Sequence, residues 1–245
     1  MQQRIQNPAY DLPFFNFLSM IFPLVQKLES EFEKYQNDAE AGSMSRYMKN
    51  RFAFYGIKKP TRAPLQKSWF STIPKNFTPE NKRDLIFELW QKEQREFHYV
   101  AMDYIAKWKD TELMIDDLSL LEFLLTNHSW WDSVDTLASN FLGRYLRLFP
   151  NQRDTVINSW RKSQNMWLRR SCLIFQLRYR SATNFTLLKG LILESKQDKE
   201  FFIQKAIGWS LREYAKTNPT SVKAFVHESG IQGLAKREAL KYLSD

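Results

Sequence analysis

Three segments of the chain place tryptophan beside charged residues. They are residues 129–135, 166–170 and 207–212. In the first, Trp131 and Asp135 are four residues apart, so they would share one face of a helix. In the second, Trp167 and Arg170 are three residues apart and would do the same. If these faces meet Trp209 of the third segment, a carboxylate, a guanidinium and several indoles would line one site.

This mixture suits hydrolysis of the bond between a sugar and a cationic base. A purine alkylated at N3 or N7 is positively charged, so it leaves as a neutral group and needs little help from a general acid. The sugar then develops oxocarbenium character, which an anionic Asp135 would stabilise while it orients the attacking water. The indoles of Trp131 and Trp209 would attract the cations. Arg170 would bind the phosphate beside the lesion, because its planar fork matches phosphate oxygens.

Each of these residues also has a structural interpretation, and the residues alone leave both open. A tryptophan at helical spacing usually belongs to the core. Asp135, or Asp132 before it, could serve as a capping or dipole acid near a helix start. The pair Arg169 and Arg170 could form a solvated face with one salt bridge.

Composition indicates a globular protein with an anionic partner. The chain has 245 residues, 43% of them hydrophobic, and its 36 Lys and Arg against 27 Asp and Glu give a net charge of +9. This balance favours nucleic acid or a membrane surface as the partner. No run approaches 18 uncharged apolar residues, so we expect no membrane span. Pro13 and Asn16 interrupt the apolar residues near the start, and no small-residue cleavage site follows them, so we expect no signal peptide. The single cysteine, Cys172, fits a reducing cytosol and is expected to be a small core residue.

Apolar periodicity and the turn residues predict an all-α fold. Leu24 to Tyr35 shows the spacing of an amphipathic helix, with a break predicted at Asn37 and Gly42. Thr78 followed by Pro79 is typical of a helix start. Further boundaries are predicted at residues 150–151 and 217–219.

Helices expected to begin near Phe97, Ser133, Met166 and Lys205 suggest an internal repeat, with offsets of 36, 33 and 39 residues. Such spacing is typical of two-helix HEAT-like units, although helices of any all-α protein can recur at this interval by chance. We therefore predict a right-handed solenoid with a concave, basic groove for duplex DNA. It would form a single domain over residues 20–245, after a poorly ordered extension at residues 1–19.

The chain resembles the AlkD-type bacterial alkylpurine DNA glycosylases of the HEAT-like repeat superfamily. The resemblance starts near residue 20 and is carried by RYMKN at 46–50, FYGI at 54–57, ELW at 88–90, REF at 95–97, SWWDSVD at 129–135, FLG at 141–143, WL at 167–168, FQL at 175–177, FFIQKAIGW at 201–209 and the stretch 211–219. It implies that Asp135 is the catalytic aspartate and that Trp131 and Trp209 are tryptophans of the groove. It also implies that Arg170 contacts DNA and that Tyr47 packs on it.

Further expectations follow from this resemblance. Lys49 and Arg169 are expected to contact DNA as well. The damaged base would not enter a deep pocket, so its charge would select substrates more than its shape does. We expect a monomer of the bacterial cytoplasm, near the nucleoid, that needs no cofactor or metal.

Other functions are less well supported. The sequence has no Gly-rich phosphate loop, metal-spaced cluster or nucleophile elbow, and His98, His128 and His227 are far apart in it. No Gly-rich helical hairpin accompanies a candidate lysine, so no covalent intermediate is expected. The main alternative is a non-catalytic repeat scaffold that binds DNA or protein in the same groove. Asp135 argues against it, because a carboxylate facing phosphates would weaken DNA binding.

Overall fold

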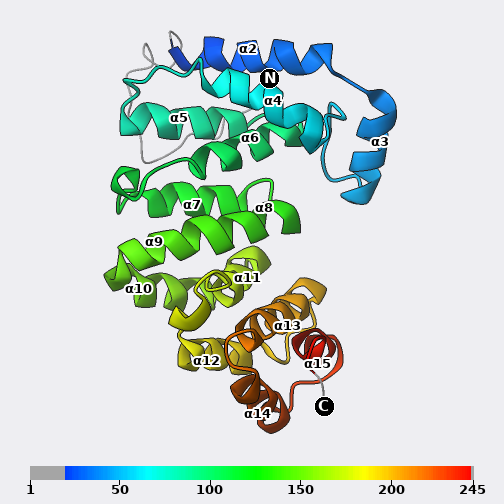
Figure 1. Cartoon of the computed structure of the whole chain (residues 1–245), viewed down its shortest axis with the longest axis vertical. Helices are drawn as coiled ribbons and strands as arrows, with labels where there is room; N and C mark the ends of the chain where they lie inside the picture. The colour runs from blue at the N-terminus through cyan, green and yellow to red at the C-terminus, as the bar shows by residue number, and fades with distance from the viewer. Residues whose placement is uncertain (1–19, 244–245) are drawn as a thin grey trace. The chain divides into compact units, whose positions relative to one another are not determined.

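The computed structural model describes residues 20–243, and these residues are helical with connecting loops (Figure 1). In this range the only strand-like pairing is an isolated bridge between Ala53 and Gln94, so the predicted all-α class is confirmed. The contacts divide the chain into two compact units, one ending at Glu112 and the other beginning at Leu113. The single domain from residue 20 onward stays a prediction. The extension predicted at residues 1–19 lies outside the described residues.

The first unit packs its helices around a core of aliphatic and aromatic side chains. Its helices are α2 (Phe22–Lys34), α3 (Asp38–Tyr47), α4 (Lys59–Phe70), α5 (Pro79–Trp90), α6 (Arg95–Ile105) and the short 3-10 turn η2 (Asp110–Glu112). Leu28, Phe32, Leu89 and Phe97 are fully buried and tie α2, α5 and α6 together. This burial, rather than helix propensity, accounts for most of the stability of such helices.

Helix starts in this unit follow their capping residues. Thr78 and Asn81 form a reciprocal capping box at the start of α5, which confirms the predicted boundary. The predicted break at Gly42 is wrong, because Gly42 lies inside α3. Asn37 caps that helix by accepting a hydrogen bond from the Glu40 N–H at 3.1 Å, and acidic residues occupy its first turn. These favourable ends offset the weak propensity of one glycine.

The second unit is a succession of helix pairs. Its elements are α7 (Asp117–Thr126), α8 (Trp131–Thr136), the π-helical segment η3 (Leu137–Leu142), α9 (Gly143–Leu148), α10 (Pro150–Trp160), α11 (Met166–Ile174), the 3-10 turn η4 (Arg180–Ala182), α12 (Phe185–Ser195), α13 (Phe201–Ala215), α14 (Pro219–Ser229) and α15 (Gly233–Leu240). The helices α7, α8 and η3 pack against α11, and α11 packs against α13 (Figure 1). Their shared core includes Leu121, Val134, Ile174 and Ile207, all fully buried.

The predicted repeat is confirmed and is more regular than the sequence suggested. The second helices of successive pairs begin at Arg95, Trp131, Met166 and Phe201, which are 36, 35 and 35 residues apart. The predicted starts near Phe97, Ser133 and Lys205 were too late by two to four residues. Each of these helices begins two or three residues before its first buried apolar side chain, and apolar periodicity does not mark those residues. The spacing agrees with a helical repeat solenoid.

Candidate active site

Asp135 and Arg170 form a bidentate ion pair between α8 and α11. Arg170 donates from Nε to Oδ1 at 2.7 Å and from Nη2 to Oδ2 at 2.9 Å. The guanidinium side chain is only 4% exposed and the carboxylate side chain 17% exposed. The fork of arginine matches both carboxylate oxygens, so this geometry fixes the orientation of Asp135.

A cluster of aromatic side chains encloses the far side of Arg170. Its Nη1 donates to the backbone carbonyl of Phe202, and its guanidinium carbon lies 5.8 Å from the centre of the Phe202 ring. Phe202 packs on Trp130 and Trp167, with ring centroids 5.2 and 5.1 Å apart. The cluster thus excludes water from one side of the ion pair and strengthens its electrostatics.

Burial raises the pKa of Asp135 above its ordinary value. The hydrogen bonds and charge of Arg170 act in the opposite direction, and the nearby Asp132 adds to the rise. Both carboxylate oxygens accept guanidinium N–H groups, which is the arrangement of an ionised carboxylate. Arg170 therefore helps to keep Asp135 charged in a site that otherwise favours its neutral form.

Asp135 and Trp209 face the same cavity, of about 340 Å³. The cavity is lined by Asp135, Thr136, Ser139, Asn140, Leu177, Arg178, Trp209 and Glu213. These residues come from the α8–η3 segment, the turn after α11, and α13. Three elements that follow one another in the repeat thus bring a carboxylate, an indole and an arginine to one opening. Trp131 is on the same helix as Asp135, one turn earlier, but does not line this cavity.

The π-helical segment begins two residues after Asp135. The chain runs without a break from Trp131 to Leu148, and residues 137–142 adopt the wider π geometry. Ser139 donates its hydroxyl to the Asp135 carbonyl at 2.7 Å, and the Asn140 amide donates to the Thr136 carbonyl at 2.9 Å. Single π turns inside helices often accompany functional sites, because they redirect side chains. Here the wider turn places Ser139 and Asn140 on the cavity wall beside Asp135.

Arg169 turns away from this cavity. Its Nη1 donates to the carbonyls of Ser163 and Gln164 at 2.9 and 3.0 Å, and its Nη2 lies 3.2 Å from an Asp198 oxygen. It therefore joins the loop before α11 to the loop before α13.

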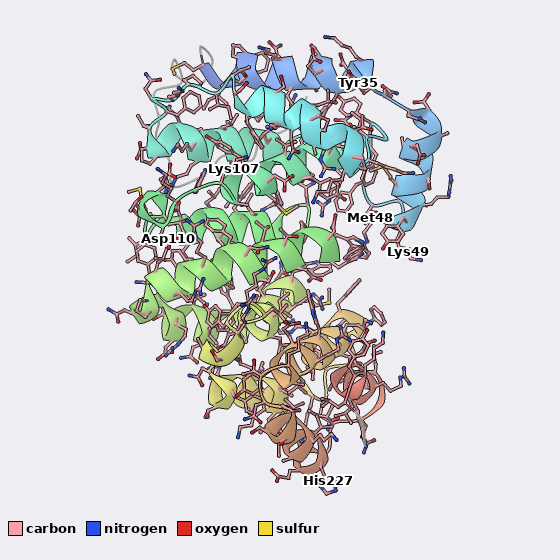
Figure 2. All side chains as sticks on the ribbon, viewed as in Figure 1. Tyr35, Met48, Lys49, Lys107, Asp110 and His227 are labelled. Atoms are coloured by element: carbon pink, nitrogen blue, oxygen red, sulfur yellow. The ribbon has the colours of Figure 1, made fainter. Side chains whose placement is uncertain are left out.

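Tyr47 and Lys49 belong to the first unit and lie where α3 ends. Tyr47 is 68% exposed, and Lys49 is also exposed. Met48 between them is buried and anchors this end of the helix (Figure 2). Lys49 and Asn50 have φ of 58° and 55°, a left-handed turn that ends the helix and presents its last side chains to solvent.

Glu96 holds the segment that follows this turn. Its buried carboxylate accepts hydrogen bonds from the backbone N–H groups of Tyr55, Gly56 and Ile57 at 3.2, 3.0 and 3.0 Å. Burial raises the pKa of Glu96, and these donors oppose that rise. One side chain of α6 thus satisfies three consecutive donors of the loop.

With this geometry described, the chain can be compared with known proteins. The sequence profile of the DNA alkylation repair enzyme family matches residues 28–243. The chain belongs to this family. A solved structure described as a predicted DNA alkylation repair enzyme from Enterococcus faecalis is similar, with 37% sequence identity and a TM-score of 0.77. The match covers 86% of this chain and 97% of that one. A search of curated proteins gives no significant match.

Membership of the DNA alkylation repair family confirms the resemblance found in the sequence and assigns the chain to the repair of alkylated DNA. The structure brings Asp135, Arg170 and Trp209 together. Arg169 contacts Ser163, Gln164 and Asp198 instead, and Trp131 does not line the cavity. Tyr47 and Lys49 are exposed at a helix end in the other unit. The roles of all seven residues stay predictions.

Several residues of this family member's site were missed by sequence analysis. They are Trp130, Ser139, Asn140, Arg178, Phe202 and Glu213. Ser139 and Asn140 depend on the π geometry, which no apolar period indicates. Trp130 adjoins the predicted Trp131, and Phe202 lies in the family-like stretch 201–209, so both could have been found from the sequence.

The histidines are divided between the two units, with His98 in the first and His128 and His227 in the second. His98 is fully buried, where Nδ1 lies 3.0 Å from Arg95 and Nε2 lies 3.0 Å from two backbone carbonyls. His227 lies on α14, far along the second unit from α8 (Figures 1 and 2). Among residues 20–243, no group of three or more His, Cys, Asp or Glu is arranged to hold a metal ion. No helix of that range combines the length and the apolar content that crossing a membrane requires.

Proposed function

We propose that the chain is a monofunctional DNA glycosylase that removes cationic N3- and N7-alkylated purines from duplex DNA and leaves an abasic site. The observation that carries this proposal is the placement of Asp135. Its carboxylate is oriented by Arg170 and lines a cavity that it shares with Trp209. Membership of the DNA alkylation repair family supports the same conclusion.

In this proposal Asp135 acts by electrostatics. As the bond to the charged base breaks, the deoxyribose gains positive charge, which a fixed carboxylate stabilises without reorganisation. The 17% exposure of the Asp135 side chain leaves room for contact with the sugar and the attacking water. The loss of such a preorganised group costs about 3 kcal/mol in the barrier, or on the order of a hundredfold in rate.

The tryptophans and basic residues complete the proposed site. Trp209 would offer its indole face to the cationic base or sugar from across the cavity, and Trp131 would do so one turn before Asp135. Tyr47 and Lys49 are the proposed contacts to the DNA backbone. The family resemblance implies the same role for Arg169 and Arg170, but both guanidinium groups already bind other groups of the protein. For Arg170 this role would require a second use of a guanidinium that already holds Asp135. We propose that the protein works as a monomer in the bacterial cytoplasm, without a cofactor.

Charge on the lesion would be the main source of selectivity. The cavity is open to solvent and of modest volume, so it does not resemble a deep pocket for an extruded base. A neutral base would have to leave as an anion, and the proposed site supplies no general acid to protonate it. We therefore expect poor activity on uncharged damaged bases.

The second candidate function is a scaffold that binds DNA or protein without chemistry. The exposed pairing of aromatic and basic side chains at the end of α3 would fit such a role equally well. The oriented carboxylate at the cavity favours the enzyme, because an anionic group on a DNA-binding surface reduces affinity.

The test is release of 7-methylguanine from a methylated duplex by the wild-type protein, Asp135→Asn and Asp132→Asn. Asp132→Asn is a matched control, because it removes the same charge from the same turn of α8. We expect the rate to fall on the order of a hundredfold in Asp135→Asn and much less in Asp132→Asn, with binding to undamaged duplex retained in both. Absence of release by the wild type, despite duplex binding, would establish the scaffold instead.

A further inference from the structure

The side chains of both arginines of α11 already form hydrogen bonds within the protein. Arg170 uses Nε and Nη2 on Asp135 and Nη1 on the Phe202 carbonyl, and it is 3% exposed. If it turned to a phosphate, it would leave a largely buried carboxylate without its partner, which is strongly unfavourable. Arg169 holds two backbone carbonyls and Asp198. Neither is placed to take a phosphate without breaking existing bonds.

Arg178 is placed differently. It is exposed and lines the cavity that contains Asp135 and Trp209. Within the described part of the chain, Arg178 forms no ion pair. Glu213 lines the same cavity, but it pairs with Lys216 at 2.7 Å, which offsets its charge. Arg178 is therefore the cation of this cavity that has no acidic partner among residues 20–243.

The backbone around Arg178 is held firmly on both sides. The Gln176 side chain accepts from the Asn184 N–H at 2.7 Å and donates to the Asn184 carbonyl at 3.3 Å. The Tyr179 hydroxyl donates to the Gly143 carbonyl at 2.5 Å. A free guanidinium on a fixed backbone is suited to binding an anion, because little backbone order is lost on binding.

We propose that Arg178 is the residue that binds the phosphate next to the damaged nucleotide. This inference rests on the proposed function, since it places the sugar of that nucleotide at Asp135. A phosphate adjoins each sugar of the strand, so a guanidinium on the same cavity wall is positioned to hold it. The planar fork would fix the register of the strand, while Arg170 remains a positioning residue for the carboxylate.

The test compares Arg178→Gln and Arg178→Lys with the wild type. Arg153→Gln is the matched control, because Arg153 lies on α10, outside the cavity, and pairs with Asp154 at 3.0 Å. Affinity for an undamaged duplex is measured over a series of salt concentrations. We expect Arg178→Gln to lower the slope of log affinity against log salt by about one, because one phosphate contact is lost. Arg178→Lys should keep most of the slope, and Arg153→Gln all of it.

Single-turnover excision of 7-methylguanine gives a second readout. In Arg178→Gln the enzyme concentration for half-saturation should rise on the order of tenfold, with a smaller change in the saturated rate. A wild-type salt slope in Arg178→Gln, or a loss confined to the saturated rate, would overturn the proposal. Circular dichroism on each variant shows whether the fold is retained, and Arg178→Lys repeats the comparison with the charge kept.

The two proposals can fail separately. Binding to undamaged duplex needs no chemistry, so the salt slope tests Arg178 even if no base is released. Absence of release by the wild type, with the salt slope still lowered in Arg178→Gln, would defeat the glycosylase proposal and leave Arg178 as a phosphate contact of a DNA-binding surface.

Discussion

The backbone carbonyl of Asp135 accepts a hydrogen bond from the Ser139 hydroxyl at 2.7 Å, while the Asp135 carboxylate accepts hydrogen bonds from Arg170. Both ends of the aspartate are thus fixed by neighbours from its own helix and from α11. Preorganisation of this kind is what electrostatic catalysis requires, because a mobile carboxylate would lose part of its effect. The geometry of the Asp135–Arg170 ion pair leads to the first two predictions.

Breaking the Asp135–Arg170 pair on one side should destabilise the protein strongly. Arg170→Gln leaves a largely buried carboxylate without its cation, so the free energy of unfolding should fall by about 3–5 kcal/mol. The double variant Asp135→Asn with Arg170→Gln should cost less than the sum of the two single variants. Urea unfolding measures all of these, with Arg153→Gln as an exposed-pair control that should change stability by less than about 1 kcal/mol. Simple additivity would contradict the coupling.

As the pH is lowered, the rate of base excision should begin to fall at a pH above the ordinary pKa of an aspartate. Burial raises the pKa of Asp135, so the carboxylate becomes neutral sooner as the pH falls, and activity should fall with it. Because Arg170 opposes this rise, Arg170→Gln should shift the acidic limb to higher pH. Single-turnover rates from pH 4 to pH 8 measure this limb. A limb that is unchanged in Arg170→Gln would show that another group controls it.

Two glycine-to-alanine substitutions should have opposite effects. At Gly56, φ is +85° and an added Cβ would lie 2.2 Å from the Asn37 carbonyl oxygen. Gly56→Ala should therefore cost about 3 kcal/mol of stability or more. At Gly190, inside α12, an added Cβ meets nothing within 4 Å, so Gly190→Ala should stabilise by about 0.5–1 kcal/mol. Thermal unfolding of both variants measures the contrast, and a stable Gly56→Ala protein would mean that α3 can shift.

Asp84 should make the protein less stable as the pH rises from 4 to 6. Burial, with repulsion from Glu80, raises the pKa of Asp84 to about 6. Between the unfolded pKa of 3.8 and this value the folded state binds more protons, so the free energy of unfolding falls as pH increases. Because the side chain is partly exposed, we expect Asp84→Asn to gain only about 1 kcal/mol at pH 7.

The measurement for Asp84 is urea unfolding at pH 4 and pH 7. Asp84→Asn should match the wild type at the lower pH and exceed it at the higher one. Asp154→Asn serves as control, because Asp154 is exposed and its pair with Arg153 lies at the surface. Equal gains at both pH values would indicate a cause other than titration.

Much of the helical order could be predicted from sequence, because it depends on local signals. The Thr78–Pro79 start and the amphipathic face of α2 are determined by neighbouring residues. The 35-residue period was detectable because each pair buries the same kind of apolar face. The wider turn at residues 137–142 was not, since it reflects packing against α7 and α11 rather than any local pattern.

The site itself could be predicted only in part. Residue types and the family resemblance identified Asp135, Arg170 and Trp209, and the structure places these three together. The direct contact between Arg170 and Asp135 was not predicted, because it joins residues 35 positions apart across two helices. Arg178 carried no sequence signal, as an isolated arginine after a helix is most often a solvated surface residue.

Cys172 lies two residues after Arg170 on α11 and is the only cysteine of the chain. It is 1% exposed, and burial raises the pKa of its thiol to about 12, so it reacts slowly with maleimides and oxidants. A cysteine introduced at the exposed Lys162 would then be the one reactive thiol in the molecule. The natural sequence is thus already suited to attachment of a single fluorophore, without removal of any native residue.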